Sequence, residues 1–457
     1  MSFARFPGIA LVVAASVALI GCGKKEEPVA AAPAAPAKPA EVVVKLGHVG
    51  PLTGGIAHLG KDNENGAQLA INEANAKGVT IGGTKVKFEL LKEDDQADPK
   101  VGTTVAQKLV DAKVVGIVGH LNSGTTIPAS SIYNQAGIPM ITGSATNPKL
   151  TEQGFKNVFR VVGRDDQQGP AVANYLLGAK PKTVAIIDDA TAYGEGLANE
   201  VEKTLKEAGV KVLPREKGTD KTVDWKAQLT KVKGKKPDAV FFGGMDATGG
   251  PLLKQARELG IKAVFAYGDG ACTDKMAELA GDAAEGMICS QAGIPVQAAS
   301  KGFSEGYKKT FNADAILYAP FTYDAANLLI ESMKKANSTD PKVYLAELAK
   351  INFTGASGGI AFDEKGDRKD AEMTIFTMKA KKIEPIAIIK SGKSMTVAEY
   401  QASAAPAAAP APAGMAGMSG MSGMAGMSGM AAAPAAPAAG MAGMSGMSGM
   451  AGMEAKK

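Results

Sequence analysis

The sequence predicts an α/β fold with parallel sheets, divided into two lobes. Short apolar runs rich in β-branched residues alternate with longer amphipathic stretches, which is the order of strands and helices in a parallel sheet. The strand-like runs are apolar throughout, so we expect helices on both faces of each sheet. The chain has 457 residues, more than one hydrophobic core usually serves, which favours two lobes.

Residues 1–21 have the features of a signal peptide. Arg5 precedes an apolar run from Gly8 to Ile20, which is too short for a membrane-spanning helix. The sequence Leu-Ile-Gly-Cys that ends at Cys22 resembles a bacterial lipobox. The resemblance implies cleavage before Cys22 and acylation of that residue, which would tether the mature protein to a membrane. The alternative is an ordinary secretory signal followed by an incidental cysteine.

Low-complexity segments flank the predicted folded body, which extends from about residue 42 to residue 397. Residues 22–41 contain Ala-Pro repeats, typical of an extended spacer. Residues 398–457 combine Ala-Pro blocks with Met-Ser-Gly and Met-Ala-Gly triplets, and neither segment can bury enough apolar surface to fold. Thioether sulfur is a ligand for Cu(I), so the Met-rich tail is a candidate copper site. The alternatives are an inert disordered spacer and an oxidisable sink.

The body divides into alternating strands and helices. Strand-like runs cover residues 42–46, 86–91, 114–118, 140–142, 184–187, 239–242 and 263–266. Helix-like stretches cover residues 63–76, 99–112, 194–208 and 248–259. In parallel sheets, ligands bind beyond the carboxyl ends of the strands, where the chain turns into the following helix. We therefore expect a site at these turns.

Three of the turns, residues 50–55, 119–126 and 143–148, are rich in glycine and small hydroxyl residues. Free N–H groups and hydroxyls at the start of a helix suit an anion such as a carboxylate, although serine and threonine also cap helices that bind nothing. Two later turns hold Tyr193 and Asp269. A buried carboxylate without a partner is costly, so Asp269 either awaits a cation or is a solvated turn residue.

The body contains two cysteines, Cys272 and Cys289. Export permits a disulfide between them, and two separately buried thiols are the alternative. A metal site is not expected, because His48, His58 and His120 lie far from the cysteines in sequence and no C-x-x-C is present. The basic residues form no block interleaved with aromatics, so nucleic-acid binding is not indicated.

Eight short motifs follow one another along residues 42–390. They are VGPLTGG (49–55), INEANAKG (71–78), DDQADP (94–99), GHLNSG (119–124), MITGSAT (140–146), YGEGLA (193–198), L-x-x-A-R-x-x-G (253–260) and FDEKGD (362–367). In this order they resemble the branched-chain amino-acid (leucine/isoleucine/valine) binding proteins of periplasmic-binding-protein fold type I. The resemblance implies two Rossmann-like lobes joined by three crossovers that close on a ligand by hinge motion. It places lobe 1 at 42–163 plus 293–371 and lobe 2 at 164–292 plus 372–397.

The resemblance also implies roles for individual residues. Ser123 would hold the α-carboxylate of an amino acid, with Thr146 assisting. The carbonyl of Ser144 and the hydroxyl of Thr146 would receive the ammonium group, together with Asp269. Tyr193 would close over the ligand from lobe 2.

The side-chain pocket departs from the family pattern. Leu59 and Met245 stand where family members often carry aromatic residues, so the preferred side chain can differ from that of leucine. Ala145 and Tyr318 complete the set of ligand-binding residues that the resemblance implies.

The resemblance implies a monomeric, extracytoplasmic (periplasmic) solute-binding protein without a cofactor, which delivers an amino acid to the permease and ATPase of an ABC importer. Alternatives on the same fold are binding of an amide, urea, a short peptide or an aromatic acid, or a role as a ligand sensor. An enzyme is not indicated, because the body lacks G-x-S-x-G, and the sequence 392–394 (GKS) lacks the upstream glycine of a P-loop.

Overall fold

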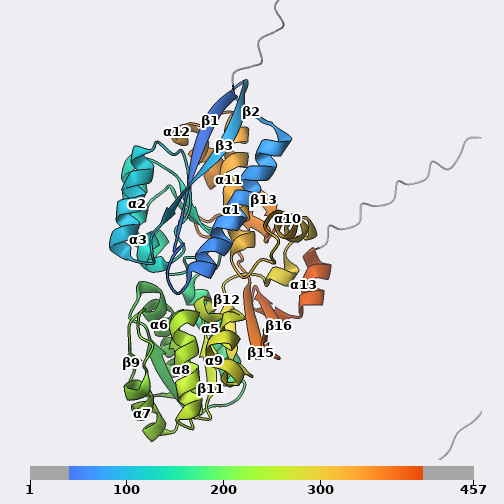
Figure 1. Ribbon diagram of the computed structural model, residues 1–457. Coiled ribbons are helices and arrows are strands. Elements are labelled where there is room, and N and C mark those ends of the chain that lie inside the picture. The colour runs from blue at the N-terminus through green and yellow to red at the C-terminus, as the bar shows by residue number, and fades with distance from the viewer. Residues whose placement is uncertain (1–40, 405–457) are drawn as a thin grey trace, which may run out of the picture. The chain divides into compact units, whose positions relative to one another are not determined.

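The computed structural model describes residues 41–404, which form two large sheets and a two-stranded hairpin (Figure 1). The predicted signal peptide, the candidate lipid-anchor residue Cys22 and the Met-rich tail lie outside these residues. Within the described part of the chain, no helix has both the length and the apolar character that a membrane span needs.

The first sheet has six strands in the order β2-β3-β1-β4-β5-β6. They are β1 (Glu41–Gly50), β2 (Val79–Ile81), β3 (Thr84–Asp94), β4 (Ile117–Gly119), β5 (Met140–Thr142) and β6 (Val158–Arg160). Every pair is parallel except β2 with β3, which form a hairpin. Gly82 and Gly83 turn this hairpin with φ angles of 60° and 75°, which glycine adopts without steric cost.

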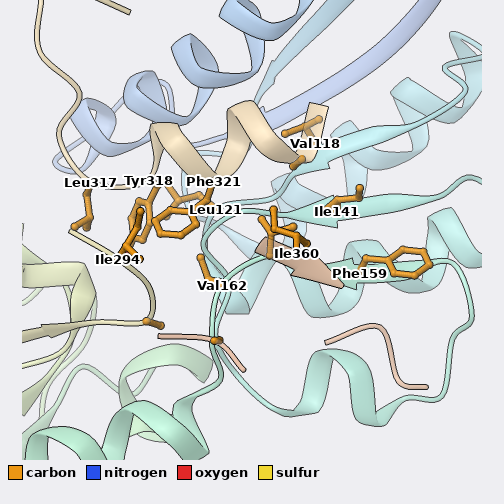
Figure 2. Packing of buried hydrophobic residues seen from close by; sticks show 14 of the residues in the cluster. Val118, Leu121, Ile141, Phe159, Val162, Ile294, Leu317, Tyr318, Phe321 and Ile360 are labelled. Carbon is orange, nitrogen blue, oxygen red and sulfur yellow. The ribbon is translucent and has the colours of Figure 1, made fainter. Parts of the chain in front are cut away.

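Helices cover both faces of the first sheet, as predicted. Helices α1 (Ala57–Lys77) and α11 (Ala319–Ala336) pack together on one face, and α2 (Pro99–Asp111) and α3 (Ser123–Ala136) on the other. Successive strand residues point to opposite faces: Ile117 packs with the α2 and α3 side, and Val118 with the α1 and α11 side. Figure 2 shows Val118 and Ile141 in the same cluster as Phe321 of α11.

The second sheet has nine strands. They are β7 (Thr183–Asp188), β8 (Lys211–Val212), β9 (Glu216–Lys217), β10 (Ala239–Gly243), β11 (Val264–Tyr267), β12 (Ile288–Gln291), β15 (Met373–Lys379), β16 (Lys382–Lys390) and β17 (Lys393–Met395). Helices α5 (Asp165–Leu177) and α6 (Ala192–Glu207) cover one face, and α7 (Lys226–Lys235), α8 (Asp246–Glu258) and α9 (Lys275–Ala280) cover the other.

The second sheet is mixed, whereas the sequence predicted parallel pairing. Strands β7 to β12 are parallel, and β15, β16 and β17 add an antiparallel edge beside β12. Two-residue turns at 380–381 and 391–392 connect these last strands, and such short turns can join only antiparallel neighbours. A disulfide between the buried Cys272 and Cys289, with an S–S distance of 2.02 Å, ties β12 to the turn after β11.

The chain passes between the two sheets three times, at residues 161–164, 292–300 and 362–372, as the resemblance implied. The exact lobe boundaries stay a prediction. Between the last two crossovers lie α10 (Lys301–Phe311), α11, α12 (Pro341–Ala349) and the hairpin of β13 (Asn352–Gly355) and β14 (Gly358–Ala361). The N–H of Gly163 donates to the carbonyl of Ala292 at 2.8 Å, so the first and second crossovers lie side by side.

The predicted start of an unstructured tail at residue 398 is wrong. Helix α13 (Val397–Ala404) continues the fold and packs on β16. Tyr400 explains the difference, because its side chain is buried and gives this short helix an apolar contact with the body.

Candidate ligand-binding site

The turns after β1, β4 and β5 in lobe 1 face the turns after β7, β10 and β11 in lobe 2. One side-chain hydrogen bond joins the lobes beside the second crossover, from Gln291 Nε2 to the carbonyl of Leu317 at 3.1 Å, and three more cross this cleft. They join His58 Nε2 to Asp246 Oδ2 at 2.7 Å, Asn147 Nδ2 to the carbonyl of Ala192 at 2.6 Å, and the Tyr318 hydroxyl to Asp269 Oδ2 at 2.6 Å. The structure therefore holds the two lobes in contact.

Ser123, the first residue of α3, lies on the lobe 1 side of the cleft. Its side chain is buried, and its Oγ accepts the N–H of Asn147 at 3.2 Å. The Thr142 hydroxyl donates to the carbonyl of His120 and accepts the N–H of Ala145, both at 2.9 Å. These bonds fix the turns after β4 and β5 against each other. The first N–H groups of α3 have no partner within the helix, so the start of α3 suits a carboxylate.

His120 holds the turn after β4 from behind. Its ring is fully buried, with Nδ1 3.0 Å from Asp95 Oδ2 and Nε2 3.0 Å from the Tyr133 hydroxyl. Both ring nitrogens are thus occupied by protein groups. We assign His120 a positioning role for the turn that presents Ser123.

The turn after β5 offers one free hydroxyl. The Ser144 hydroxyl donates to the carbonyl of Leu121 and pairs with Asn63, so its side chain is already used. Ala145 is buried, and its carbonyl accepts a hydrogen bond from Arg160 at 3.0 Å. Thr146 Oγ1, in contrast, is buried without a hydrogen-bond partner.

Asp269 lies in the turn after β11, on the lobe 2 side of the cleft, and its carboxylate accepts hydrogen bonds from two tyrosines. The Tyr193 hydroxyl donates to Oδ1 at 2.7 Å and accepts the N–H of Gly270 at 2.9 Å, while Tyr318 occupies Oδ2. Burial raises the pKa of Asp269, and the two tyrosine hydroxyls oppose this rise. Asp269 is therefore no solvated turn residue.

Asp165, the first residue of α5, is the site residue that sequence reasoning missed. Its side chain is fully buried, and neither carboxylate oxygen has a hydrogen-bond partner. Its backbone N–H donates to the carbonyl of Thr146 at 2.9 Å, which places it beside the free hydroxyl of that residue. Burial raises the pKa of Asp165 well above its usual range; the nearby Thr146 hydroxyl opposes this rise, and the nearby Asp269 adds to it. Two neighbouring buried carboxylates favour a cation between them.

The apolar side of the cleft contains Leu59 and Met245. Both are buried and belong to the hydrophobic cluster that also contains Tyr193 and Tyr318. A cavity of about 680 Å³ opens next to them and is lined from both lobes. Among the predicted site residues, Tyr193 and Met245 line this cavity. The buried polar residues that would bind the charged groups of a ligand do not line it; we call them the head-group site, and they are Ser123, Thr146, Asp165 and Asp269. The cavity therefore suits the side chain of a ligand.

Comparisons with known proteins show the family of this chain. A sequence profile of the periplasmic binding protein family matches residues 43–382. The chain belongs to this family. A leucine-, isoleucine-, valine-, threonine- and alanine-binding protein of Pseudomonas aeruginosa is 35% identical over 336 residues, which is 73% of this chain and 89% of the relative.

Solved structures of periplasmic binding proteins show the same fold. A leucine-binding protein from Thermotoga maritima has a TM-score of 0.71 at 30% identity, covering 76% of this chain and 99% of that one. A branched-chain amino-acid transporter substrate-binding protein from Streptococcus pneumoniae, in complex with isoleucine, has a TM-score of 0.69 at 28% identity, covering 76% of this chain and 100% of that one.

This periplasmic binding protein also has a larger cavity, of about 770 Å³, which is lined by Gln291, Leu317 and Lys382 among others. None of the predicted site residues lines it. Its lysines 275 and 382 are already paired with acidic residues, and its buried polar atom without a partner, Gln291 Oε1, belongs to a neutral amide, whereas Asp165 is a carboxyl. The cavity of about 680 Å³ is therefore the candidate ligand site. Within residues 41–404, no cluster of three or more His, Cys, Asp or Glu side chains could hold a metal ion.

Proposed function

We propose that this protein captures a free α-amino acid with an apolar side chain, branched-chain amino acids foremost, and delivers it to an ABC importer. The proposal rests on one observation: the cleft has two sites for charged groups, and they prefer opposite charges. The start of α3 at Ser123 suits an anion, and the unpartnered carboxyl of Asp165 suits a cation. An amino acid is a zwitterion that supplies both charges on one carbon atom.

The ammonium group would sit between Thr146 Oγ1 and Asp165, which are both buried and both lack a partner. Asp269 adds negative charge from lobe 2 while its tyrosines hold it in place. A hydrogen bond to a charged group contributes about 1.5–3 kcal/mol, so a few such bonds can stabilise the closed lobes. Met245, which lines the cavity and shares a hydrophobic cluster with Leu59, would contact the side chain.

The names of the relatives support this ligand class. The Pseudomonas aeruginosa relative is a leucine-, isoleucine-, valine-, threonine- and alanine-binding protein, and the Streptococcus pneumoniae structure contains isoleucine. Delivery to an importer rests on the same relatives.

The proposal includes an extracytoplasmic location with Cys22 as the lipid anchor. The lipobox-like sequence at 19–22 supports it, together with membership of the periplasmic binding protein family. A Cys22→Ser variant expressed in a bacterial host should move from the membrane fraction to the soluble extracytoplasmic fraction. A variant that stays with the membranes would show that Cys22 is not the anchor.

The ligand class is tested by removing one head group at a time. Isothermal titration calorimetry would compare L-leucine with isocaproate, which lacks the ammonium group, and isoamylamine, which lacks the carboxylate. We expect binding of leucine alone, because each analogue leaves one of the two sites unsatisfied. Benzoate and L-leucinamide belong in the same series. Binding of either in preference to leucine would replace the amino-acid proposal by an aromatic-acid or amide one.

A further inference from the structure

Helix α13 lies against the crossovers that form the hinge. It follows β17, the edge strand of the lobe 2 sheet, and packs on β16 and on the short helix at Val296–Ala298 in the second crossover. Gln401 Nε2 donates to the carbonyl of Gln297 in that crossover at 3.1 Å. The end of the described chain is thus bonded to a segment that connects the two lobes.

Tyr400 joins α13 to the third crossover. Its buried hydroxyl donates to Glu372 Oε1 at 2.8 Å, and Glu372 is the last residue before β15. Glu372 is itself fully buried and paired with Lys390 at 2.8 Å and with Arg368 at 3.2 Å. Burial alone would raise the pKa of Glu372, but these two cations hold it below its ordinary value.

Arg368 extends the network to the first crossover and to lobe 1. Its guanidinium donates to the carbonyl of Val161 at 3.1 Å and to the carbonyl of Ser357 at 2.9 Å. A continuous chain of buried polar contacts therefore links Tyr400 through Glu372 and Arg368 to Val161. Together with Gln401, α13 is connected to all three crossovers.

Hinge motion changes the backbone torsions of the crossovers and rotates the lobes about them. Helix α13 is bonded to two crossovers and covalently attached to lobe 2. It therefore cannot keep its bonds to both crossovers when the lobes rotate. Its contacts coexist here with the three hydrogen bonds that cross the cleft. We propose that α13 is a strap across the hinge that stabilises the closed arrangement of the lobes and so slows ligand release.

The test compares three variants of the full-length protein. Tyr400→Phe removes one hydroxyl and keeps the buried ring, and Gln401→Ala removes a single bond from an exposed side chain, so neither is expected to prevent folding. Tyr323→Phe is the matched control, because its hydroxyl makes the same kind of bond, to Glu73 at 2.8 Å, within lobe 1. The readouts are hydrogen exchange of the crossover amides without ligand and the dissociation rate of L-leucine.

We expect exchange of crossover amides such as that of Gly163 to accelerate about tenfold in Tyr400→Phe and less in Gln401→Ala, since a hydrogen bond to a charged acceptor is lost in the first variant. Leucine should dissociate faster in the same order, and Tyr323→Phe should match the wild type in both readouts. The strap proposal is wrong if the exchange rates of the crossover amides in Tyr400→Phe equal those of the wild type, or if they rise equally in Tyr323→Phe. The leucine readout rests on the proposed function, whereas the exchange readout does not. If the wild-type protein does not bind leucine, the proposed ligand is wrong, and the hydrogen-exchange result alone decides whether α13 acts as a strap.

Discussion

Replacing Asp165 by asparagine should weaken amino-acid binding and at the same time stabilise the ligand-free protein. The two effects have one cause, since the buried carboxyl of Asp165 has no hydrogen-bond partner in the protein and, on our proposal, receives the ammonium group of the ligand. Asparagine keeps nearly the same shape and removes the charge. A residue that only supports the fold would not show this combination.

The loss of affinity follows from the interaction that disappears. A hydrogen bond between charged groups contributes about 1.5–3 kcal/mol, which corresponds to roughly 10- to 150-fold in the dissociation constant for leucine. The same substitution should not weaken any residual binding of isocaproate, because that ligand has no ammonium group to pair with Asp165.

The gain in stability should depend on pH. Because the pKa of Asp165 is raised in the folded protein, folded Asp165 keeps a proton that the unfolded chain releases above about pH 4. The carboxyl therefore makes the wild type less stable as the pH rises, by up to about 1.4 kcal/mol per pH unit within that window. Asp165→Asn lacks this contribution, so its advantage in unfolding free energy should grow as the pH rises above about 4.

Urea unfolding at several pH values and calorimetric titration with leucine would measure both effects. Asp324→Asn is an informative control. Burial raises the pKa of Asp324 to about 6 as well, but its carboxylate accepts hydrogen bonds from Ala356 and Ser357. We expect that variant to be less stable than the wild type and to bind leucine normally. An Asp165→Asn protein that binds leucine as tightly as the wild type would refute the assignment of the ammonium site.

Three further predictions concern the contacts around the site and the core. His58→Ala removes a bond across the cleft to a buried carboxylate, and we expect roughly tenfold weaker leucine binding by calorimetry. Replacing both Cys272 and Cys289 by alanine opens a cross-link with a sequence separation of 17, which should lower the unfolding free energy in urea by about 3 kcal/mol. Burial lowers the pKa of His48 to about 4, so the folded protein should lose stability as the pH falls from about 6.5 towards 4, and His48→Gln should lose less over that window.

Each of these predictions has its own control. For the cleft contact, Tyr323→Phe changes a hydrogen bond within lobe 1 and should leave leucine affinity unaltered. For the disulfide, reduction of the wild type should reproduce the alanine variant, and equal stability with and without reductant would contradict the expected contribution. For the histidine, parallel loss of stability in wild type and variant on acidification would show that other groups govern this pH range.

The alternation of strands and helices was predictable because it depends on local patterns. The predicted strand at 140–142 has the same bounds as β5, and Ser123 begins a helix as its turn chemistry indicated. Tyr193 and Asp269 were expected in the same site, and the structure joins them by a hydrogen bond of 2.7 Å. Their role in ligand binding stays a prediction.

Other features depend on contacts that no local pattern shows. Asp165 is one of two successive acidic residues in the first turn of α5, a common arrangement at exposed helix starts. Its burial results from the approach of the turns after β5 and β11, which come from different lobes. Helix α13 is short and carries one large buried side chain, Tyr400, whose partner Glu372 belongs to a crossover. Neither the apolar period nor the capping pattern predicts these partners.

The three crossovers also decide the order in which the lobes can be completed. All strands of the first sheet come from residues 41–160, but α11, which covers one of its faces, comes from residues 319–336. The parallel part of the second sheet and its helices are instead contiguous between residues 165 and 291. The first lobe, although synthesised first, receives α11 only after the parallel part of the second lobe has been made, so the apolar face at Val118 and Ile141 lacks this helix in the interval. Folding intermediates that expose such a face are prone to aggregate, so this is the surface on which a chaperone would have most effect.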